Sequence, residues 1–306
     1  MSEAVDTRLR KVLSENIREA LSAVSTKGEF SKEKIKAARK SIKKVRTLLR
    51  LLSLSIKGSW LKTEEDLLKD ISRQFKGLRD IFIIEEVFKE IIPLLKKEKV
   101  DCDPNEILKL FESLESETIT KFQSDKSKLR SIIGDLQVAN ERLDEMLFKV
   151  SPWESIEDGL VKTYKSCHKI YKDLSKNPSN EECISLRKLV NFLFIELNFL
   201  SAYLKPEAKE FLKKVDVFSK EMGHVQDTIL VFQAIKENKK QFASPEQYKN
   251  LTSFLETHQH QLVQTVREKG KLIFESSPKS FFQKIIENEQ VKDEKKKFKE
   301  KKTSLG

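Results

Sequence analysis

Apolar residues recur at intervals of three and four along most of this 306-residue chain, which is the spacing of one buried helix face. The clearest case is Ser31 to Lys57, where Ile35, Ala38 and Ile42 begin a stripe that continues to Leu52. Glycine and proline are scarce, at 8 and 7 residues, which also favours helices. The same pattern predicts further helices over residues 2–25, 63–97 with a break near Gly77, 104–150 as one helix or two, 154–174, 180–204, 207–239 and 245–274, with a short last helix from Pro278. The sequence therefore predicts an all-α fold.

The helical pattern is interrupted most clearly at Ser151-Pro152-Trp153. We therefore expect a first helical bundle over residues 1–150 and a second over residues 151–290. Residues 291–306 carry seven lysines and almost no apolar side chains, which predicts a disordered basic tail.

Positive charge is concentrated in two places. The predicted helix at 31–57 has ten Lys or Arg and one acid, a net +9, and residues 291–306 add +4. The whole chain carries +11, so the remainder carries 11 − 9 − 4 = −2. A merely solvated helix face usually mixes both signs, so this asymmetry favours a polyanionic partner.

The cations of the 31–57 helix follow the apolar stripe one residue later. Like charges three and four residues apart repel, and a bound anion would relieve that repulsion. The stripe consists of Lys36, Arg39, Lys43, Arg46 and Arg50, and Lys40 and Lys44 extend it outward.

Two short motifs occur once in each half of the chain. Ala38-Arg39-Lys40 matches Leu186-Arg187-Lys188 at an offset of 148 residues, and Leu78-Arg79-Asp80 matches Val225-Gln226-Asp227 at 147. The shared order and offset indicate duplication of a unit of about four helices.

These motifs resemble those of the CHAD family, the conserved histidine α-helical domain proteins. The resemblance rests on the basic segment from Lys36 to Leu52 and on the segments Leu78 to Ile84, Gly159-Leu160 with Tyr164, Arg187 to Val190 and Gly223 to Asp227. It implies two four-helix bundles related by a pseudo-two-fold axis. It also implies a basic groove between them that binds inorganic polyphosphate or other phosphate polyanions. Polyphosphate suits such a stripe, because Arg grips phosphate oxygens in pairs and Lys supplies mobile point charges.

The predicted contacts come from both halves of the chain. Arg79 is expected to approach Arg39 from the following helix, and the second half is expected to contribute fewer cations. The predicted polyphosphate-binding residues are Lys36, Arg39, Lys40, Lys43, Arg46, Arg50, Arg79, Lys162, Lys165, Arg187 and Lys188.

The sequence departs from the family pattern at its histidines. Lys36, Ile184 and Gln226 stand where the family carries histidine, and the second basic stripe is replaced by Asn191, Phe194 and Ile195. The chain is thus a diverged member by this resemblance, with anion-binding capacity concentrated in its first half.

No phosphate-binding Gly-rich loop, metal-ligand spacing or Ser-His-Asp pattern is present, so we expect neither an enzyme nor a cofactor. Asp80 and Asp227 are expected to orient Arg39 or Arg187 by pairing with them. A helical scaffold for an acidic protein and non-specific nucleic-acid binding remain as alternatives.

The three cysteines are far apart and read as reduced thiols, and no signal peptide or membrane span is evident. We therefore expect a cytoplasmic protein, with polyphosphate granules as a second location.

Overall fold

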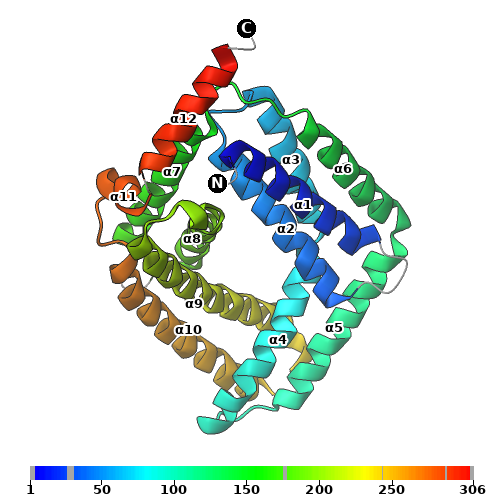
Figure 1. Ribbon diagram of the computed structural model, residues 1–306. Coiled ribbons are helices and arrows are strands. Elements are labelled where there is room, and N and C mark those ends of the chain that lie inside the picture. Colours follow the sequence, from blue (N-terminus) through cyan, green and yellow to red (C-terminus); the bar gives the residue numbers. More distant parts are fainter. Residues whose placement is uncertain (1–3, 26–30, 175–177, 243, 287, 304–306) are drawn as a thin grey trace.

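The computed structural model describes residues 4–25, 31–174, 178–242, 244–286 and 288–303, and they form helices joined by short connections (Figure 1). The described residues contain no β-strand, only isolated bridges between Ile56 and Phe148 and between Leu204 and Ile286. The all-α prediction is confirmed. In order, the helices are α1 Val5–Ser25, α2 Lys32–Leu51, α3 Gly58–Gln74, α4 Lys76–Lys97, α5 Pro104–Ser124, α6 Lys126–Asp144, α7 Pro152–Asp173, α8 Asn180–Phe199, α9 Pro206–Glu237, α10 Pro245–Ile273, α11 Pro278–Ile285 and α12 Asn288–Thr303, with short 3-10 turns at Leu200–Tyr203 and Lys239–Gln241.

Local sequence explains where many of these helices begin. Proline occupies an early position of α5, α7, α9 and α10, where its missing N–H costs no hydrogen bond. Ser31 caps α2 by accepting a hydrogen bond from the Lys34 amide. Ser179 and Glu182 form a capping box at the start of α8.

The basic helix is shorter than predicted. It ends at Leu51, and residues 52–57 turn toward the start of α7. The Leu54 amide donates to Ser155 Oγ at 2.9 Å, and Ser55 Oγ donates to the Ser151 carbonyl at 3.1 Å. These long-range bonds compete with continuation of the helix, so the prediction of one helix from Ser31 to Lys57 is wrong at its C-terminal end.

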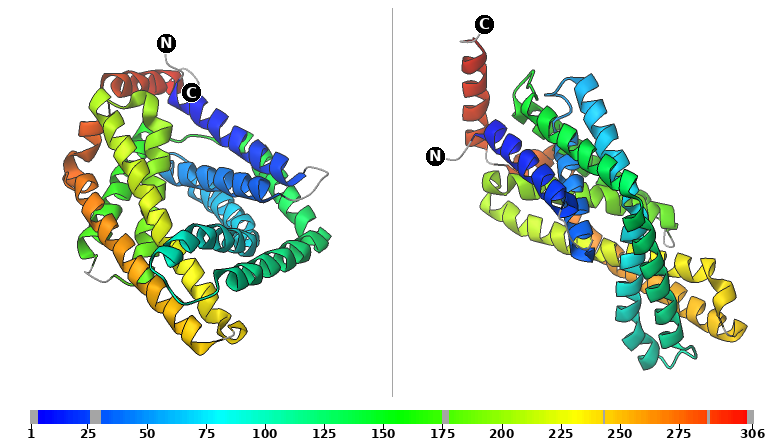
Figure 2. Two further views of the ribbon diagram at one scale, coloured as in Figure 1. Left: turned by 90° about the horizontal axis from the view of Figure 1, so that it is seen from below. Right: turned by 90° about the vertical axis from the view of Figure 1, so that its right-hand side faces the viewer.

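One apolar core runs through the described part of the chain. α1 packs on α2, α8 on α9, and α9 on α10, while α4 against α9 and α2 against α8 join the two halves. The α4–α5 and α9–α10 pairs cross and extend beyond the other helices (Figure 2). α7 begins at Pro152, inside the expected interruption, and buries Trp153. Residues 151–153 are therefore packed into the apolar core.

The repeat has a counterpart in the helix boundaries. α2 and α8 are both 20 residues long and begin 148 residues apart (180 − 32), the offset of the Arg39 and Arg187 motifs. In the first half, α3 and α4 are separated at buried Phe75, two residues before the predicted break at Gly77. In the second half, the 32 residues of α9 form one continuous helix.

The predicted disordered tail is instead largely helix α12. Val291 is buried, and Glu294 accepts hydrogen bonds from the Val5 amide (3.0 Å) and from Trp153 Nε1 (2.9 Å). Lys295 lies 3.0 Å from Glu157. These contacts hold α12 beside the start of α1 (Figure 2), and the sequence pattern did not reveal them. Residues 304–306 of the predicted tail lie outside the described residues.

None of the described helices has both the length and the apolar content needed to cross a membrane.

Candidate functional site: a cationic cavity between the two halves

A cavity of about 440 Å³ lies among α2, α3, α4, α8 and α9. Eight of its fourteen lining residues are Lys or Arg, and none is Asp or Glu. We call this cavity the charged compartment. Its cations are Lys36, Arg39, Lys40, Lys43, Arg46, Arg79, Arg187 and Lys188, all of which belong to the predicted site.

Helix α2 supplies most of these cations because its opposite face is anchored. Ile35, Ala38 and Ile42 are at most 1 % exposed, which turns the neighbouring stripe toward the cavity. Arg39 Nη1 donates to the Ser72 carbonyl in the last turn of α3 at 3.1 Å. Burial, reinforced by the charge of Arg79, lowers the pKa of Arg39 to about 10. Keeping Arg39 charged in this position is therefore electrostatically unfavourable.

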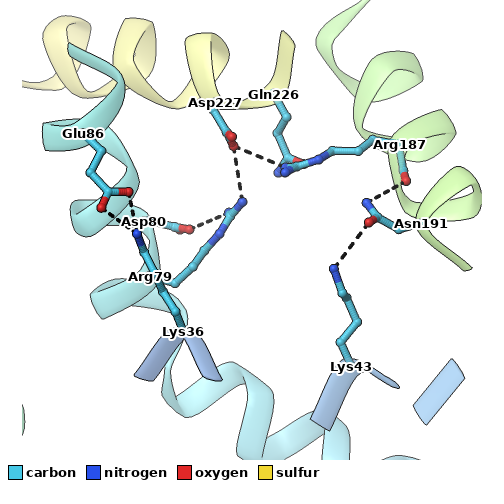
Figure 3. Close-up of polar contacts among 9 residues, drawn as sticks. All are labelled: Lys36, Lys43, Arg79, Asp80, Glu86, Arg187, Asn191, Gln226 and Asp227. Atoms are coloured by element: carbon cyan, nitrogen blue, oxygen red, sulfur yellow. Dashed lines mark hydrogen bonds and ion pairs between the residues drawn. The ribbon is translucent and has the colours of Figure 1, made fainter. Parts of the chain in front are cut away.

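Arg79 and Arg187 approach one carboxylate from opposite halves of the chain (Figure 3). Asp227 Oδ1 lies 3.6 Å from Arg79 Nη2 and 3.4 Å from Arg187 Nη1. Gln226 Oε1 also accepts a hydrogen bond from Arg187. The expected pairing of Asp227 with Arg187 is confirmed.

The expected pairing of Asp80 with Arg39 does not form. Asp80 lies 2.8 Å from Arg79, its neighbour in the sequence. Arg39 bonds to the Ser72 carbonyl in α3 instead. The carboxylate that we expected beside Arg39 therefore contacts Arg79.

Lys43 rises from α2 toward Asn191 on α8 (Figure 3). Its Nζ donates to Asn191 Oδ1 at 3.4 Å, and Asn191 is itself held by donating to the Arg187 carbonyl at 3.1 Å. Burial, followed by the charges of Arg187, Arg79 and nearby cations, lowers the pKa of Lys43 to about 8. Lys43 is nevertheless exposed at the mouth of the cavity, so its ammonium is accessible to a ligand.

Two guanidinium groups lack part of their hydrogen bonding. The Nε atoms of Arg46 and Arg187 are buried without an acceptor, and burial lowers the pKa of both residues. Buried charges with unfilled hydrogen-bonding capacity are destabilising. An anion in the charged compartment would stabilise both electrostatically.

The three positions that carry histidine in the family pattern all line this compartment. Lys36 lies at its edge, where Nζ is 2.6 Å from the Glu86 carboxylate. Ile184 contributes an apolar surface, and Gln226 fixes Arg187. Lys36 is thus partly neutralised, unlike Lys43.

A second cavity, of about 530 Å³, adjoins the first between α2, α8 and α9. The two share Lys40, Lys43, Arg187 and Asn191 as lining residues. We call the second cavity the mixed compartment, because apolar, polar and charged side chains line it together. Its remaining lining residues are Lys44, Phe194, Ile195, Asn198, Asp216, Ser219, Lys220, Gly223, His224 and Asp227.

Sequence reasoning recognised Asn191, Phe194 and Ile195 only as lost basic positions, and it missed the contributions of Asn198, Ser219 and His224 to this cavity. The offset of 148 residues, which places Asn191 in register with Lys43, was the one available signal.

Three predicted site residues line neither compartment. The Arg50 guanidinium lies over the Phe192 ring, 4.4 Å from its centroid. Lys162 pairs with Asp158 at 2.6 Å, and Lys165 is exposed on the same helix. Arg50 is at the end of α2 and the two lysines are on the solvent face of α7, so helical spacing alone did not place them correctly.

No group of three or more His, Cys, Asp or Glu residues within the described ranges has the arrangement of a metal site.

Comparison with known proteins identifies the family. No curated protein matches this chain. Two solved structures share the fold: the CHAD domain of the plant Ricinus communis (13 % identity, TM-score 0.61, covering 88 % of this chain and 92 % of that one) and PptA from Streptomyces chartreusis (12 % identity, TM-score 0.62, covering 90 % and 100 %). The family model of the CHAD domain matches residues 9–235, which is most of the chain and includes the charged compartment. This chain therefore belongs to the CHAD domain family.

Proposed function

We propose that the charged compartment binds inorganic polyphosphate and carries out no reaction on it. The observation that carries the proposal is the lining of eight cations and no carboxylate. Cations this close repel one another, and part of their hydration is lost, so the empty site is electrostatically costly. A chain with about one negative charge per phosphate offsets that cost along its whole length.

The geometry favours a chain of phosphates over a single small anion. Cations enter the cavity from α2, α4 and α8, so they are spread over its walls. Arg39, Arg79 and Arg187 offer planar guanidinium groups suited to phosphate oxygens, and Lys43 offers a mobile point charge.

A concave site is also less suited to the two alternatives. An acidic protein helix or a nucleic-acid duplex would meet only the cations at the edge, such as Lys36 and Lys188. The less exposed ones, Arg79 and Arg187, lie inside the cavity, with side chains that are 20 % and 18 % exposed. Single-stranded RNA is the competitor to test, because it can present a narrow row of phosphates.

The two motif aspartates beside the site are engaged in positioning arginines. Asp80 pairs with Arg79, and Asp227 pairs with both Arg79 and Arg187. Acting as a general base would require either carboxylate to give up these partners, so we propose binding without catalysis. We further propose that the protein works in the cytoplasm and is retained on polyphosphate granules.

Two charge-matched triple variants test the proposal. Arg39→Gln, Lys43→Gln and Arg46→Gln remove three cations from the charged compartment. Arg50→Gln, Lys162→Gln and Lys165→Gln remove three cations that line neither compartment. Both proteins lose the same net charge, so a difference between them reports position.

The first variant should bind long polyphosphate at least ~10²-fold more weakly than the wild type, since each charge-assisted contact contributes roughly 1.5 to 3 kcal/mol when desolvated and less when exposed. The second should stay within about threefold. Titration at physiological salt, with helicity checked by circular dichroism, measures both. Equal losses in the two variants would refute the site, and preferential displacement of polyphosphate by RNA of matched charge would refute the ligand.

A further inference from the structure

The two compartments adjoin each other, share four lining residues and differ in their chemistry. They meet where Lys43 Nζ contacts Asn191 Oδ1 at 3.4 Å, and Ser219 Oγ donates to the same Asn191 oxygen at 3.4 Å. On one side the lining is cationic. On the other side, apolar and neutral polar groups stand among charges of both signs, including Lys44, Lys220, Asp216 and Asp227. The apolar part of this lining offers a polyphosphate chain no contact.

The mixed compartment suits a flat, partly apolar group. Phe194 and Ile195 are half-buried and provide an apolar wall on α8. Asn198 and His224 are exposed beside this wall and offer hydrogen-bond donors and acceptors. An aromatic ring with polar edges could use both kinds of group, because any nucleobase has a face that stacks on an aromatic side chain.

Gly223 lines the mixed compartment next to Arg187, a residue that both compartments share. It is buried within α9, where glycine costs about 1 kcal/mol relative to alanine. A Cβ at this position would meet only Arg187 Nη2, at an ordinary contact distance of 3.6 Å. Helix packing therefore does not require glycine here. Its effect is to leave free the space in front of Arg187.

The repeat shows where the change in chemistry occurs. At an offset of 148 residues, Arg46 of α2 corresponds to Phe194 of α8, and Arg50 corresponds to Asn198. Cationic positions in the first half thus have neutral counterparts in the second, and these counterparts line the mixed compartment.

From this geometry we infer that the cavity takes a nucleoside polyphosphate, with its phosphates in the charged compartment and its base against Phe194 in the mixed compartment. Both volumes lie in the range of small-molecule sites. The inference rests on the proposed anion site and adds a recognition element for the organic end of the ligand.

The decisive comparison is between ATP and methyl triphosphate, which carry similar charge but differ in the nucleoside. We expect wild-type protein to bind ATP about tenfold more tightly in calorimetric titrations without divalent cations. Phe194→Ala should abolish this preference and leave methyl triphosphate binding within about twofold. Gly223→Leu, which fills the space in front of Arg187, should have the same effect. It provides a second test if Phe194→Ala does not fold. Phe192→Ala is the matched control, since Phe192 is on the same helix but lines neither compartment.

The possible outcomes separate the inference from the function on which it rests. Equal wild-type affinity for ATP and methyl triphosphate would overturn the inference and leave polyphosphate binding intact. An ATP preference that persists in both Phe194→Ala and Gly223→Leu would also overturn it. Failure of tripolyphosphate and longer chains to bind would instead refute the anion site itself.

Discussion

Helices α2 and α8 are related by the internal repeat, have equal length and lie on two sides of the same cavity, yet their chemistry differs. α2 carries nine Lys or Arg and one acid, whereas α8 carries two bases and three acids. Lys43 and Asn191 stand at equivalent positions and bond to each other. A duplicated backbone can therefore keep its packing while one copy supplies the charge and the other shapes the cavity.

The same comparison extends to the buried faces. Leu48 of α2 corresponds to Glu196 of α8, and both are at most 1 % exposed. Glu196 Oε1 accepts a hydrogen bond from Thr163 at 3.0 Å, while Oε2 is buried without a donor. Burial raises the pKa of Glu196 to about 8, although the Thr163 bond and the charge of Arg50 oppose the shift. α8 thus has a carboxyl where α2 has a leucine.

The largest effect is expected from Glu196→Gln. In the unfolded chain this carboxyl loses its proton near pH 4.5, but in the folded protein it keeps it up to about pH 8. Stability present below pH 4.5 is therefore lost as the pH rises through this window. Relative to the wild type, the variant should gain about 2 to 4 kcal/mol between pH 5 and pH 8.

Chemical denaturation at a series of pH values measures this gain, and its pH dependence carries the test. The hydrogen-bonding cost of the new amide is constant, so it cancels in the difference. Glu181→Gln, an exposed acid on the same helix, should show a small and flat effect. A Glu196→Gln difference that does not change with pH would show that the carboxyl is charged in the folded protein.

The two halves also differ in how many arginines the aspartate of each repeated motif contacts. Asp227 contacts two arginines, whereas Asp80 contacts one. Asp227→Asn should lower the free energy of unfolding by about 1 to 3 kcal/mol, because it leaves Arg79 and Arg187 to repel each other. Asp80→Asn should cost about 1 kcal/mol or less.

Polyphosphate should raise the melting temperature of Asp227→Asn more than that of the wild type, since phosphate replaces the missing negative charge. Thermal unfolding with and without tripolyphosphate measures this. Equal destabilisation by Asp80→Asn and Asp227→Asn would show that the Asp227 carboxylate does not link Arg79 to Arg187.

Sequence periodicity predicted the features that depend on residues close together in the chain. The stripe of α2 follows from apolar spacing, and the approach of Arg79 to Arg39 follows from the pairing of their motifs. The end of α2 did not follow, because it depends on bonds from Leu54 and Ser55 to residues about a hundred positions away. Helix α12 was missed for the same reason, since Glu294 is fixed by Trp153.

The sequence also could not predict which face of a helix points to solvent, or where a cavity lies between helices. Lys162 and Lys165 are basic and helical, but the face of α7 on which they stand is determined by tertiary packing. The mixed compartment is a space between helices, and its apolar wall, Phe194 and Ile195, looked like ordinary loss of a basic stripe.

Restoring charge to the second half is the third test. Phe194→Arg returns a cation to the position equivalent to Arg46, and long polyphosphate should bind about fivefold to tenfold more tightly, with a steeper dependence on salt. Phe192→Arg adds the same charge on the same helix outside both compartments, and we expect less than a twofold effect at physiological salt. Equal gains from the two variants would mean that net charge, rather than position in the cavity, governs affinity.

The smallest expected effect concerns Lys43, the cation at the junction of the two chemistries. Its lowered pKa of about 8 means that the free protein begins to lose this charge just above neutral pH, whereas a bound phosphate favours the ammonium. Polyphosphate affinity should therefore fall about twofold to fivefold as the pH rises from 7 to 9, the effect of one partly exposed contact. Binding should also take up protons above pH 8, which titration calorimetry in buffers of different ionisation enthalpy can detect.

Lys43→Gln should bind more weakly at pH 7 and lose this pH dependence, while Lys40→Gln, which removes a neighbouring cation, should keep it. The same fall in affinity in Lys43→Gln would assign the titration to another group.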